Sequence, residues 1–168
     1  MTHAGLYLLN SEHILDGFDC GKPALNDWLV RRALGNQASG TSRTWVIIED
    51  GSKRVVAFYS SSTASVLRNR APKKFARNQP EEIPAILLGR MAVDSRHQGA
   101  HLGSALLQHF MIKAIDVAAA VGVRLLLVHA KDDEAKAFYA HYGFVESPLD
   151  ALTMLMLLTL DAKQQFSR

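Results

Sequence analysis

The chain of 168 residues contains a single cysteine, Cys20. One thiol excludes both a disulfide framework and a cysteine-based metal cluster. Long apolar runs are also missing: the nearly charge-free apolar stretch Ala151–Leu160 is shorter than the ~20 residues that a membrane-spanning helix needs. The first residues show no basic segment followed by a long apolar one, so we expect no signal peptide, no membrane association and a cytoplasmic location.

Internal repeats, low-complexity segments and long linkers are absent as well. Hydrophobic residues make up 48% of the chain and charged residues 21%, a balance that excludes disordered, collagen-like and coiled-coil chains. A length of 168 residues is usual for one domain with a sizeable core. We therefore expect a single domain over residues 1–168.

Positive charge is concentrated in the first half of the chain. Residues 1–80 hold eleven Lys or Arg and six Asp or Glu, whereas residues 81–168 hold eight and ten. The densest group of cations, called the basic cluster below, consists of Arg68, Arg70, Lys73, Lys74 and Arg77. It fits two interpretations, a surface that binds nucleic-acid phosphates or a solvated loop that contains proline, and composition does not decide between them.

Apolar runs and helical periodicity alternate along the chain. Apolar runs predict strands near Leu6–Leu9 and over Thr44–Glu49, Val55–Ser62, Ala85–Val93, Val123–Ala130 and Leu152–Leu160. Helical spacing predicts helices from Pro23 through Arg32, ending near Gly35; from His101 to Val121, capped by Gly122; and from Asp132 to Tyr142, stopped by Gly143. Residues 67–83 are expected to form a loop. The order predicts a mixed α/β domain with a strand–helix–strand crossover over residues 85–130.

The segment that begins at Leu88, LGRMAVDSRHQGAHLGSALL, predicts a buried strand, a turn of small residues and a helix. The first N–H groups of a helix lack internal partners, and the helix dipole adds partial positive charge there. The turn QGAHLG over residues 98–103 is therefore a candidate cradle for a pyrophosphate. A plain strand-to-helix connection has the same appearance. Neither GxGxxG nor GxxxxGK[ST] is present, which disfavours a Rossmann unit and a P-loop.

Three features in this order resemble the GNAT superfamily of acetyl-CoA-dependent N-acetyltransferases. They are RMAVD at a strand end (residues 90–94), a Q-x-x-G-x-G-like turn (98–103) and A-x-x-F-Y-x-x-x-G-F (135–144). The resemblance implies the GNAT fold, with a central, mostly antiparallel sheet, a splayed βαβ core and flanking helices. It also implies acetyl-CoA as cosubstrate and no metal.

In that family the turn amides hold the CoA pyrophosphate, the preceding strand pairs with the pantetheine arm, and the F-Y helix lies beside the thioester. The cofactor-binding residues implied here are Met91, Ala92, Val93, Gln98, Gly99, Ala100, His101, Leu102, Gly103, Ser104 and Phe138. Two residues depart from the pattern. His101 replaces a glycine, which is acceptable if its φ is negative, as in a first helical turn. Asp132 replaces an asparagine, and because a carboxylate repels phosphates no CoA contact is assigned to it.

A second set of residues resembles the GNAT toxins of bacterial type II toxin–antitoxin modules. The set comprises Phe18-Asp19-Cys20-Gly21, Leu25, Trp28-Leu29, Arg43-Thr44-Trp45 and Phe58-Tyr59-Ser60. This resemblance implies acetylation of the amino group of aminoacyl-tRNA, a block of translation, a ribbon-helix-helix antitoxin and a homodimer. Two alternatives stay open: a GNAT enzyme that acts on a small amine or a protein N-terminus, and a non-catalytic acyl-CoA-binding module.

Tyr139 is the predicted general acid, because a phenol with a pKa of about 10 can protonate a thiolate with a pKa of about 8.5. The related toxins use the tyrosine of their F-Y pair in this way; the alternative is a tyrosine that only packs against the cofactor. Tyr142 is a weaker candidate. A general base is not evident, and an α-amine with a pKa of about 7.7–8.0 is neutral in roughly 10–15% of molecules at pH 7 without one. His129 fits either a proton relay or a structural role.

Further roles follow from the same reaction. Backbone N–H groups of Met91–Val93 are the predicted donors to the oxyanion. Arg90 lies in an otherwise apolar strand and must pair internally, reach solvent or face the substrate. With tRNA as the substrate, the basic cluster is expected to contact phosphates, together with Arg31, Arg32 and Arg43.

Overall fold

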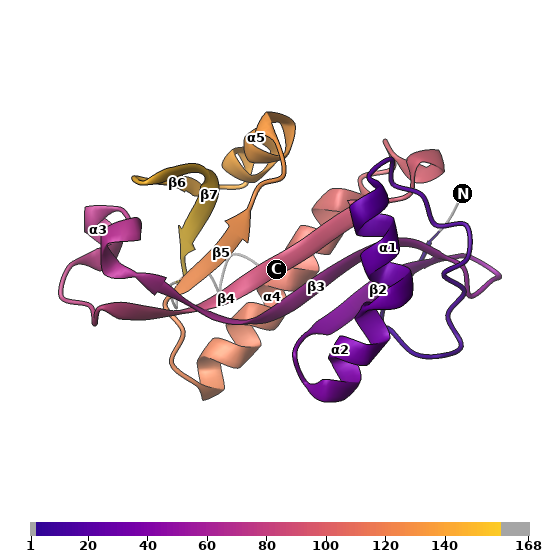
Figure 1. Cartoon of the computed structure of the whole chain (residues 1–168), viewed down its shortest axis with the longest axis horizontal. Helices are drawn as coiled ribbons and strands as arrows, with labels where there is room; N and C mark the ends of the chain where they lie inside the picture. Colours follow the sequence, from indigo (N-terminus) through magenta and orange to yellow (C-terminus); the bar gives the residue numbers. More distant parts are fainter. Residues whose placement is uncertain (1–2, 159–168) are drawn as a thin grey trace. The chain divides into compact units, whose positions relative to one another are not determined.

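The computed structural model describes residues 3–158 (Figure 1). Its seven strands form one mixed sheet in the order β1-β2-β3-β4-β5-β7-β6. The chain divides into two compact units, Met1–Ser62 with Gly89–Phe110 and Thr63–Leu88 with Met111–Arg168. Each unit is described separately below, and the single-domain organisation of residues 1–168 stays a prediction. Among the described helices none is long and apolar enough to cross a membrane.

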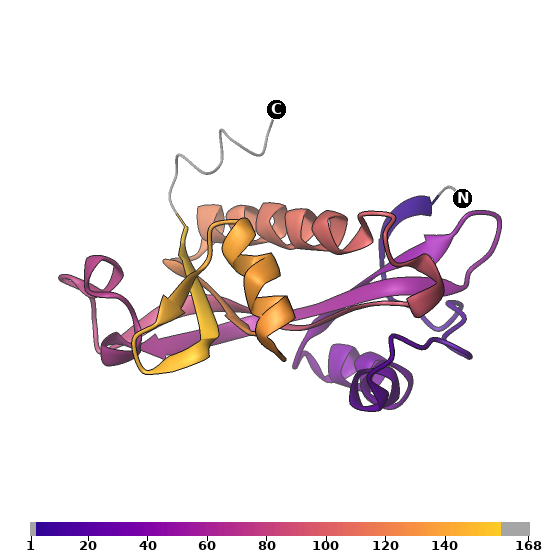
Figure 2. The same ribbon diagram turned by 90° about the horizontal axis from the view of Figure 1, so that it is seen from above.

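The first unit is built on β1 (His3–Leu8), β2 (Arg43–Glu49) and the first part of β3 (Val55–Leu67), which pair antiparallel. Side chains alternate between the two faces of a strand. Phe58 stacks on Trp28 of α1 (Pro23–Arg31), with ring centroids 6.0 Å apart, whereas Tyr59 packs edge-on against Phe110 of α4 (Leu102–Ala120). Helices α1 and α2 (Ala33–Ser39) therefore cover one face, and the first half of α4 covers the other (Figure 2).

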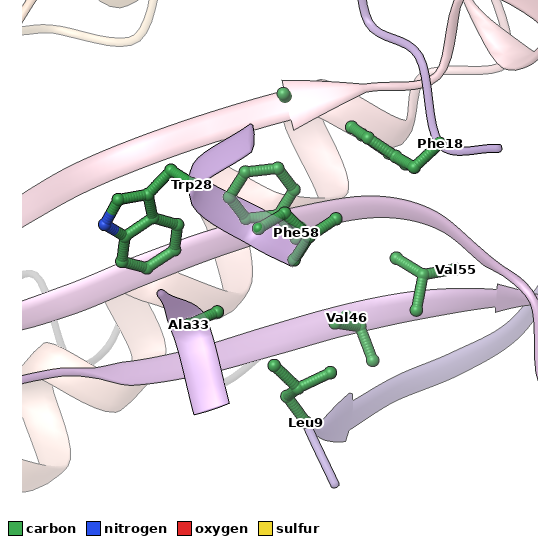
Figure 3. Packing of buried hydrophobic residues seen from close by; sticks show 9 residues of the cluster. Leu9, Phe18, Trp28, Ala33, Val46, Val55 and Phe58 are labelled. Carbon is green, nitrogen blue, oxygen red and sulfur yellow. The ribbon is translucent and has the colours of Figure 1, made fainter. Parts of the chain in front are cut away.

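A hydrophobic cluster fills the space between these strands and α1 (Figure 3). Its buried members are Leu9, Phe18, Trp28, Leu29, Ala33, Val46, Val55, Phe58 and Ala92. Full burial of a Leu, Val or Phe side chain contributes about 1.5–3 kcal/mol, so this cluster is a main source of stability for the unit. Several of these residues carry the toxin resemblance, and in the fold they serve as core.

The helical segment that starts at Pro23 differs from its prediction. Helix α1 ends at Arg31, and a second helix, α2, continues to Ser39, where Gly40 takes a φ of 84°. The side chain of Gln37 fixes α2, because it donates to the Leu9 carbonyl at 2.7 Å and accepts from the Thr44 N–H at 3.0 Å. Leu9 lies 28 positions and Thr44 seven positions from Gln37, so the sequence pattern near Gly35 did not reveal these contacts.

The second unit contains part of the crossover that the sequence predicted; the end of β4 and the first half of α4 belong to the first unit. Strand β4 (Glu82–Val93) pairs in parallel with β5 (Leu125–His129) from Ala85 to Leu88, and α4 connects the two strands. Strand β7 (Asp150–Leu157) pairs antiparallel with β5 and with β6 (Val145–Ser147). The three-residue β6 escaped prediction because it is too short for a clear alternation. The predicted last strand extended to Leu160, which lies outside the described residues.

The helix ends of this unit agree only in part with the prediction. Helix α5 (Asp133–His141) is followed by Gly143 with a φ of 100°, which confirms the predicted stop. Helix α4 ends at Ala120, and Gly122 does not have a positive φ, so the predicted glycine cap is wrong. Val117, expected on the apolar face of α4, is 42% exposed. The buried face of α4 therefore ends before the helix does.

Residues 67–83, expected as a loop, contain two short helical turns between β3 and β4. These are η1 (Arg68–Arg70) and α3 (Lys73–Ala76). Phe75 and Ala76 are buried in a cluster with Val66 and Ile83, which anchors the turns to the sheet. Because Phe75 is buried, the backbone that carries the basic cluster has a defined conformation.

Candidate active site

The turn after β4 is fixed by Asp94, whose side chain is buried. Its carboxylate accepts the backbone N–H groups of Asp19 and Arg96 at 3.1 and 2.9 Å, and the Arg96 guanidinium binds it through Nε at 3.0 Å and through Nη2. The Ser95 N–H also donates to the Asp19 carbonyl at 2.8 Å. These hydrogen bonds join the residues just before the candidate pyrophosphate-binding turn to the Phe18–Gly21 loop. The Asp94–Arg96 pair was not singled out from the sequence, although Asp94 ends the RMAVD motif.

Hydrogen bonds from the Arg96 side chain, with those from the two backbone N–H groups, lower the pKa of Asp94 to about 2. Because this folded value lies below the unfolded value of about 3.9, ionised Asp94 stabilises the fold above about pH 5, and the contribution is lost as the pH falls toward 2. We expect Asp94→Asn to lower the free energy of unfolding by about 2 kcal/mol at pH 7 and by much less near pH 2. Urea unfolding at both pH values measures this difference. An equal loss at both pH values contradicts it.

The turn itself begins with η2 (Ser95–His97) and then takes two left-handed residues, Gly99 at a φ of 86° and His101 at 60°. The expectation of a negative φ at His101 is therefore wrong. The chain keeps the backbone conformation that suits the glycine of the Q-x-x-G-x-G pattern, at a cost of about 1–2 kcal/mol for a residue with a side chain. The His101 carbonyl accepts the Ser104 hydroxyl at 2.9 Å and the Ala105 N–H at 3.2 Å, which holds this conformation at the start of α4.

The N-terminus of α4 has the properties expected of an anion-binding turn. Leu102 is buried and anchors the helix, while residues 98–101 are exposed. The first N–H groups of a helix have no intrahelical acceptor, so those of Leu102, Gly103 and Ser104 are available to a diphosphate. Gln98 Nε2 lies 3.4 Å from the Val93 carbonyl and links the turn to the end of β4.

The end of β4 lies in the same unit as this turn. Ala92 packs in the core, whereas Met91 and Val93 are half-buried. Arg90 pairs with no carboxylate in the part of the chain that the structure describes, and its guanidinium lies over the Trp28 ring, 4.4 Å from the ring centroid. The sequence had left the partner of Arg90 open.

In the second unit, α5 carries Phe138 and Tyr139. The Tyr139 side chain is buried and packs edge-on against Phe138 and Phe144, with ring centroids 5.3 and 5.8 Å apart. Burial raises the pKa of Tyr139 above its ordinary value, so the phenol keeps its proton at neutral pH. Its hydroxyl has no hydrogen-bond partner within residues 3–158, which leaves it free to donate to a ligand.

The residue that departs from the F-Y motif has a structural explanation. The Asp132 carboxylate accepts the Ala135 N–H at 2.8 Å and caps α5. Aspartate is as good an N-cap as asparagine, so the replacement preserves the helix start. The absence of a CoA contact at Asp132 stays a prediction.

Two other candidates in this unit occupy different surroundings. Tyr142 is 39% exposed and contacts Phe138, with ring centroids 5.1 Å apart. His129 Nδ1 lies 3.1 Å from the Thr153 hydroxyl, which itself donates to Asp150 at 2.8 Å. Because that hydroxyl proton is used by Asp150, His129 donates its Nδ1–H to the Thr153 oxygen and is held in one orientation. This bonding fits the structural interpretation of His129.

The basic cluster is exposed at all five positions, and none of its side chains forms an ion pair in the described part of the chain. Arg68 Nη1 donates to the Gln79 carbonyl at 2.9 Å. The backbone beneath is held by two side chains, since Ser147 Oγ donates to the Arg70 carbonyl at 2.6 Å and Arg124 Nε donates to the Phe75 carbonyl at 2.9 Å. The cations are thus displayed on a fixed backbone, and the nearby Asp150 carboxylate, whose pKa Arg70 helps to lower, forms no ion pair with them in the described part of the chain.

A glycine-bearing turn at a helix N-terminus, preceded by RMAVD and followed in the chain by the F-Y helix, defines the class. The sequence model of the acetyltransferase (GNAT) domain matches residues 40–146. The chain belongs to the GNAT acetyltransferase family and is an acetyl-CoA-dependent acetyltransferase. The predicted family and fold class are confirmed.

More particular similarities lie among toxins. The chain is 47% identical over 146 residues to the tRNA-acetylating toxin of Mycobacterium tuberculosis (strain ATCC 25618 / H37Rv), covering 87% of this chain and 86% of that one. It is 26% identical to a tyrosine-to-phenylalanine mutant of KacT, with a TM-score of 0.88 and coverage of 96% and 97%. It shares its fold with a mutant AtaT toxin bound to the C-terminus of the antitoxin AtaR and acetyl-CoA, at 23% identity, a TM-score of 0.82 and 98% coverage of both chains.

Proposed function

We propose that this protein is a toxin that transfers an acetyl group from acetyl-CoA to the α-amino group of aminoacyl-tRNA and thereby blocks translation. The similarity to the Mycobacterium tuberculosis toxin, at 47% identity over 87% of the chain, carries this proposal. The unpaired basic cluster supports it, because a polyanionic acceptor needs such a surface. The proposal places the protein in the cytoplasm, as a homodimer, with a ribbon-helix-helix antitoxin as its regulator.

Acetyl-CoA is held in this proposal mainly by the end of β4 and the turn that follows it. The N–H groups of Leu102, Gly103 and Ser104 bind the pyrophosphate, supported by Gln98, Gly99, Ala100 and His101 of the turn. Met91, Ala92 and Val93 of β4 pair with the pantetheine arm, and Phe138 of α5 packs beside the thioester. The stable geometry of the turn, which Asp94 and Arg96 fix, keeps these amides in place without rearrangement.

The chemical step joins the amine nitrogen of the acceptor to the carbonyl carbon of the thioester. As the N–C bond forms, the carbonyl oxygen becomes an oxyanion, which a backbone N–H of Met91–Val93 stabilises. The oxyanion then reforms the carbonyl, the C–S bond breaks, and Tyr139 donates its phenolic proton to the CoA thiolate. The amine loses one proton to solvent, and Tyr139 is reprotonated from solvent, so the products are the amide and CoA.

A protein base is not needed for this acceptor. An α-amine with a pKa of about 7.7–8.0 is neutral in roughly 10–15% of molecules at pH 7, and an adjacent ester lowers that pKa further by withdrawing electrons. A free lysine, with a pKa of about 10.4, is neutral in only about one molecule in 2,500. The bonding of His129 to Thr153 agrees with a site that leaves deprotonation to the solvent.

The direct test is an assay of acetyl transfer from labelled acetyl-CoA to total charged tRNA. Transfer that disappears after the aminoacyl ester is hydrolysed supports the proposal. The protein is instead a small-amine or N-terminal acetyltransferase if it is inactive on charged tRNA and strongly active on polyamines, aminoglycosides or peptides with a free N-terminus. Binding of acetyl-CoA without turnover of any amine assigns a binding module.

The basic cluster offers a separate test on tRNA binding. Reversing Lys73, Lys74 and Arg77 to glutamate is expected to weaken tRNA binding and to flatten its salt dependence by about 0.7–0.9 of a log–log unit for each phosphate contact that is lost. The tRNA dissociation constant is measured across a salt series for the single, double and triple variants, so that stepwise loss provides the internal control. Acetyl-CoA binding should stay unchanged, because it relies on backbone amides elsewhere. Equal slopes in all variants assign the cluster to a solvated surface.

The same charge argument extends to the antitoxin. An acidic or amphipathic antitoxin segment requires a cationic face, and the basic cluster is the densest one in the sequence. We therefore include in the proposal that such a segment competes with tRNA for this surface. Competition is measured by displacement of labelled tRNA by the antitoxin tail, with the triple variant as the control.

A further inference from the structure

Arg90 is held in an unusual position for a charged side chain in a strand. Its guanidinium lies over Trp28, 4.4 Å from the ring centroid, and Trp28 stacks on Phe58 with a centroid distance of 6.0 Å and an interplanar angle of 14°. Trp28 and Phe58 are buried in the core cluster, so the base of this stack does not move freely (Figure 3). A cation–π contact of this kind fixes the guanidinium in place.

No carboxylate of residues 3–158 forms an ion pair with this fixed cation. Within residues 3–158, the Arg90 side chain forms no ion pair and no hydrogen bond, although it is exposed. Partial burial against Trp28 lowers the pKa of Arg90, yet a guanidinium stays charged at neutral pH. The guanidinium carbon lies over the ring, and within residues 3–158 no N–H group of the side chain is used in a hydrogen bond. Such a fork suits two parallel hydrogen bonds to a phosphate or carboxylate.

The position of Arg90 along β4 connects it to the reaction. It directly precedes Met91–Val93, which supply the oxyanion donors in the proposed function. A strand rises about 3.3 Å per residue, so the Arg90 backbone lies within about 10 Å of all three. An anionic group bound to Arg90 therefore belongs to the reacting end of a substrate.

We propose that Arg90, positioned by Trp28, binds the 5′-phosphate of the terminal nucleotide that carries the amino acid. This inference rests on the proposed function and names the substrate group that the end of β4 recognises. Phosphate is the anion of the acceptor end, since an aminoacyl ester has no free carboxylate. Arg90 is a substrate-binding residue in this assignment, and Trp28 is a positioning residue.

The test uses two substrates that differ only in that phosphate: 3′-aminoacyl-adenosine with and without a 5′-phosphate. For the wild type, the phosphate is expected to raise kcat/KM by about 10- to 100-fold, the range for a charge-assisted bidentate contact. In Arg90→Gln most of this gain should disappear. Arg90→Lys keeps the charge but not the fork, so it should recover only part of the gain. Lys53→Gln, which removes one charge at the β2–β3 hairpin, is the matched control and should keep the full gain.

Each result decides a different question. An equal gain from the phosphate in wild type and Arg90→Gln overturns the inference and leaves the proposed function intact. A rise in KM for acetyl-CoA of more than about tenfold, with the phosphate gain unchanged, assigns Arg90 to CoA and also overturns it. A wild-type enzyme that acetylates neither these esters nor charged tRNA overturns the proposed function and the inference together. Circular dichroism melting curves, compared with the wild-type curve, show that Arg90→Lys is folded.

Discussion

Tyr139→Phe is expected to lower kcat for acetylation of charged tRNA by about 10²–10⁴-fold, the usual contribution of a general acid. The substitution removes one hydroxyl, while the ring contacts with Phe138 and Phe144 remain. Acetyl-CoA affinity should therefore change little, and toxicity in growing cells should disappear. Single-turnover kinetics measures the chemical step, and calorimetry measures acetyl-CoA binding.

The control for this prediction is Tyr142→Phe, which removes a hydroxyl from the neighbouring exposed tyrosine and should leave turnover nearly intact. The pH profile adds a second criterion. Because burial raises the pKa of Tyr139, the wild-type rate should rise as the amine deprotonates below about pH 8 and should not fall again below about pH 10. A Tyr139→Phe enzyme that keeps more than about a third of wild-type turnover contradicts the assignment, given the expected 10²-fold or larger loss.

Gly103→Asp is the second substitution with a large expected effect. Gly103 is the second residue of α4, where the backbone N–H groups are proposed to hold the CoA pyrophosphate. An aspartate there adds a side chain and a negative charge beside the phosphates, so acetyl-CoA binding should weaken by well over tenfold. The fold should survive, because an acidic side chain near a helix N-terminus stabilises the helix.

Gly103→Asn is the matched control, since it has the same size as aspartate without the charge. We expect it to weaken acetyl-CoA binding less than Gly103→Asp does. The difference between the two affinities, measured by calorimetry, is the part of the loss that the negative charge causes. Both variants should have the circular dichroism spectrum of the wild type. Unchanged affinity in a folded Gly103→Asp protein means that the phosphates bind elsewhere.

Much of the secondary structure was predictable because its causes are local. The apolar runs of β2 and β5, the Pro23 helix start and the Gly143 stop depend on residues within a few positions of one another. The prediction failed where a tertiary contact decided the outcome. Gln37 extends α2 by binding Leu9 and Thr44, and buried Phe75 folds residues 67–83 into helical turns.

In the candidate site, too, some features follow from the sequence and others only from tertiary contacts. The sequence by itself determined the family and the residues of the turn and of the F-Y motif, because their spacing along one chain is the pattern that the chemistry requires. Only the tertiary structure decided that His101 has a left-handed backbone, that Asp94 binds the Asp19 N–H across 75 positions, and that Arg90 lies on Trp28. These features depend on which distant groups meet after folding, and hydrogen bonds to the Asp94 carboxylate then lower its pKa.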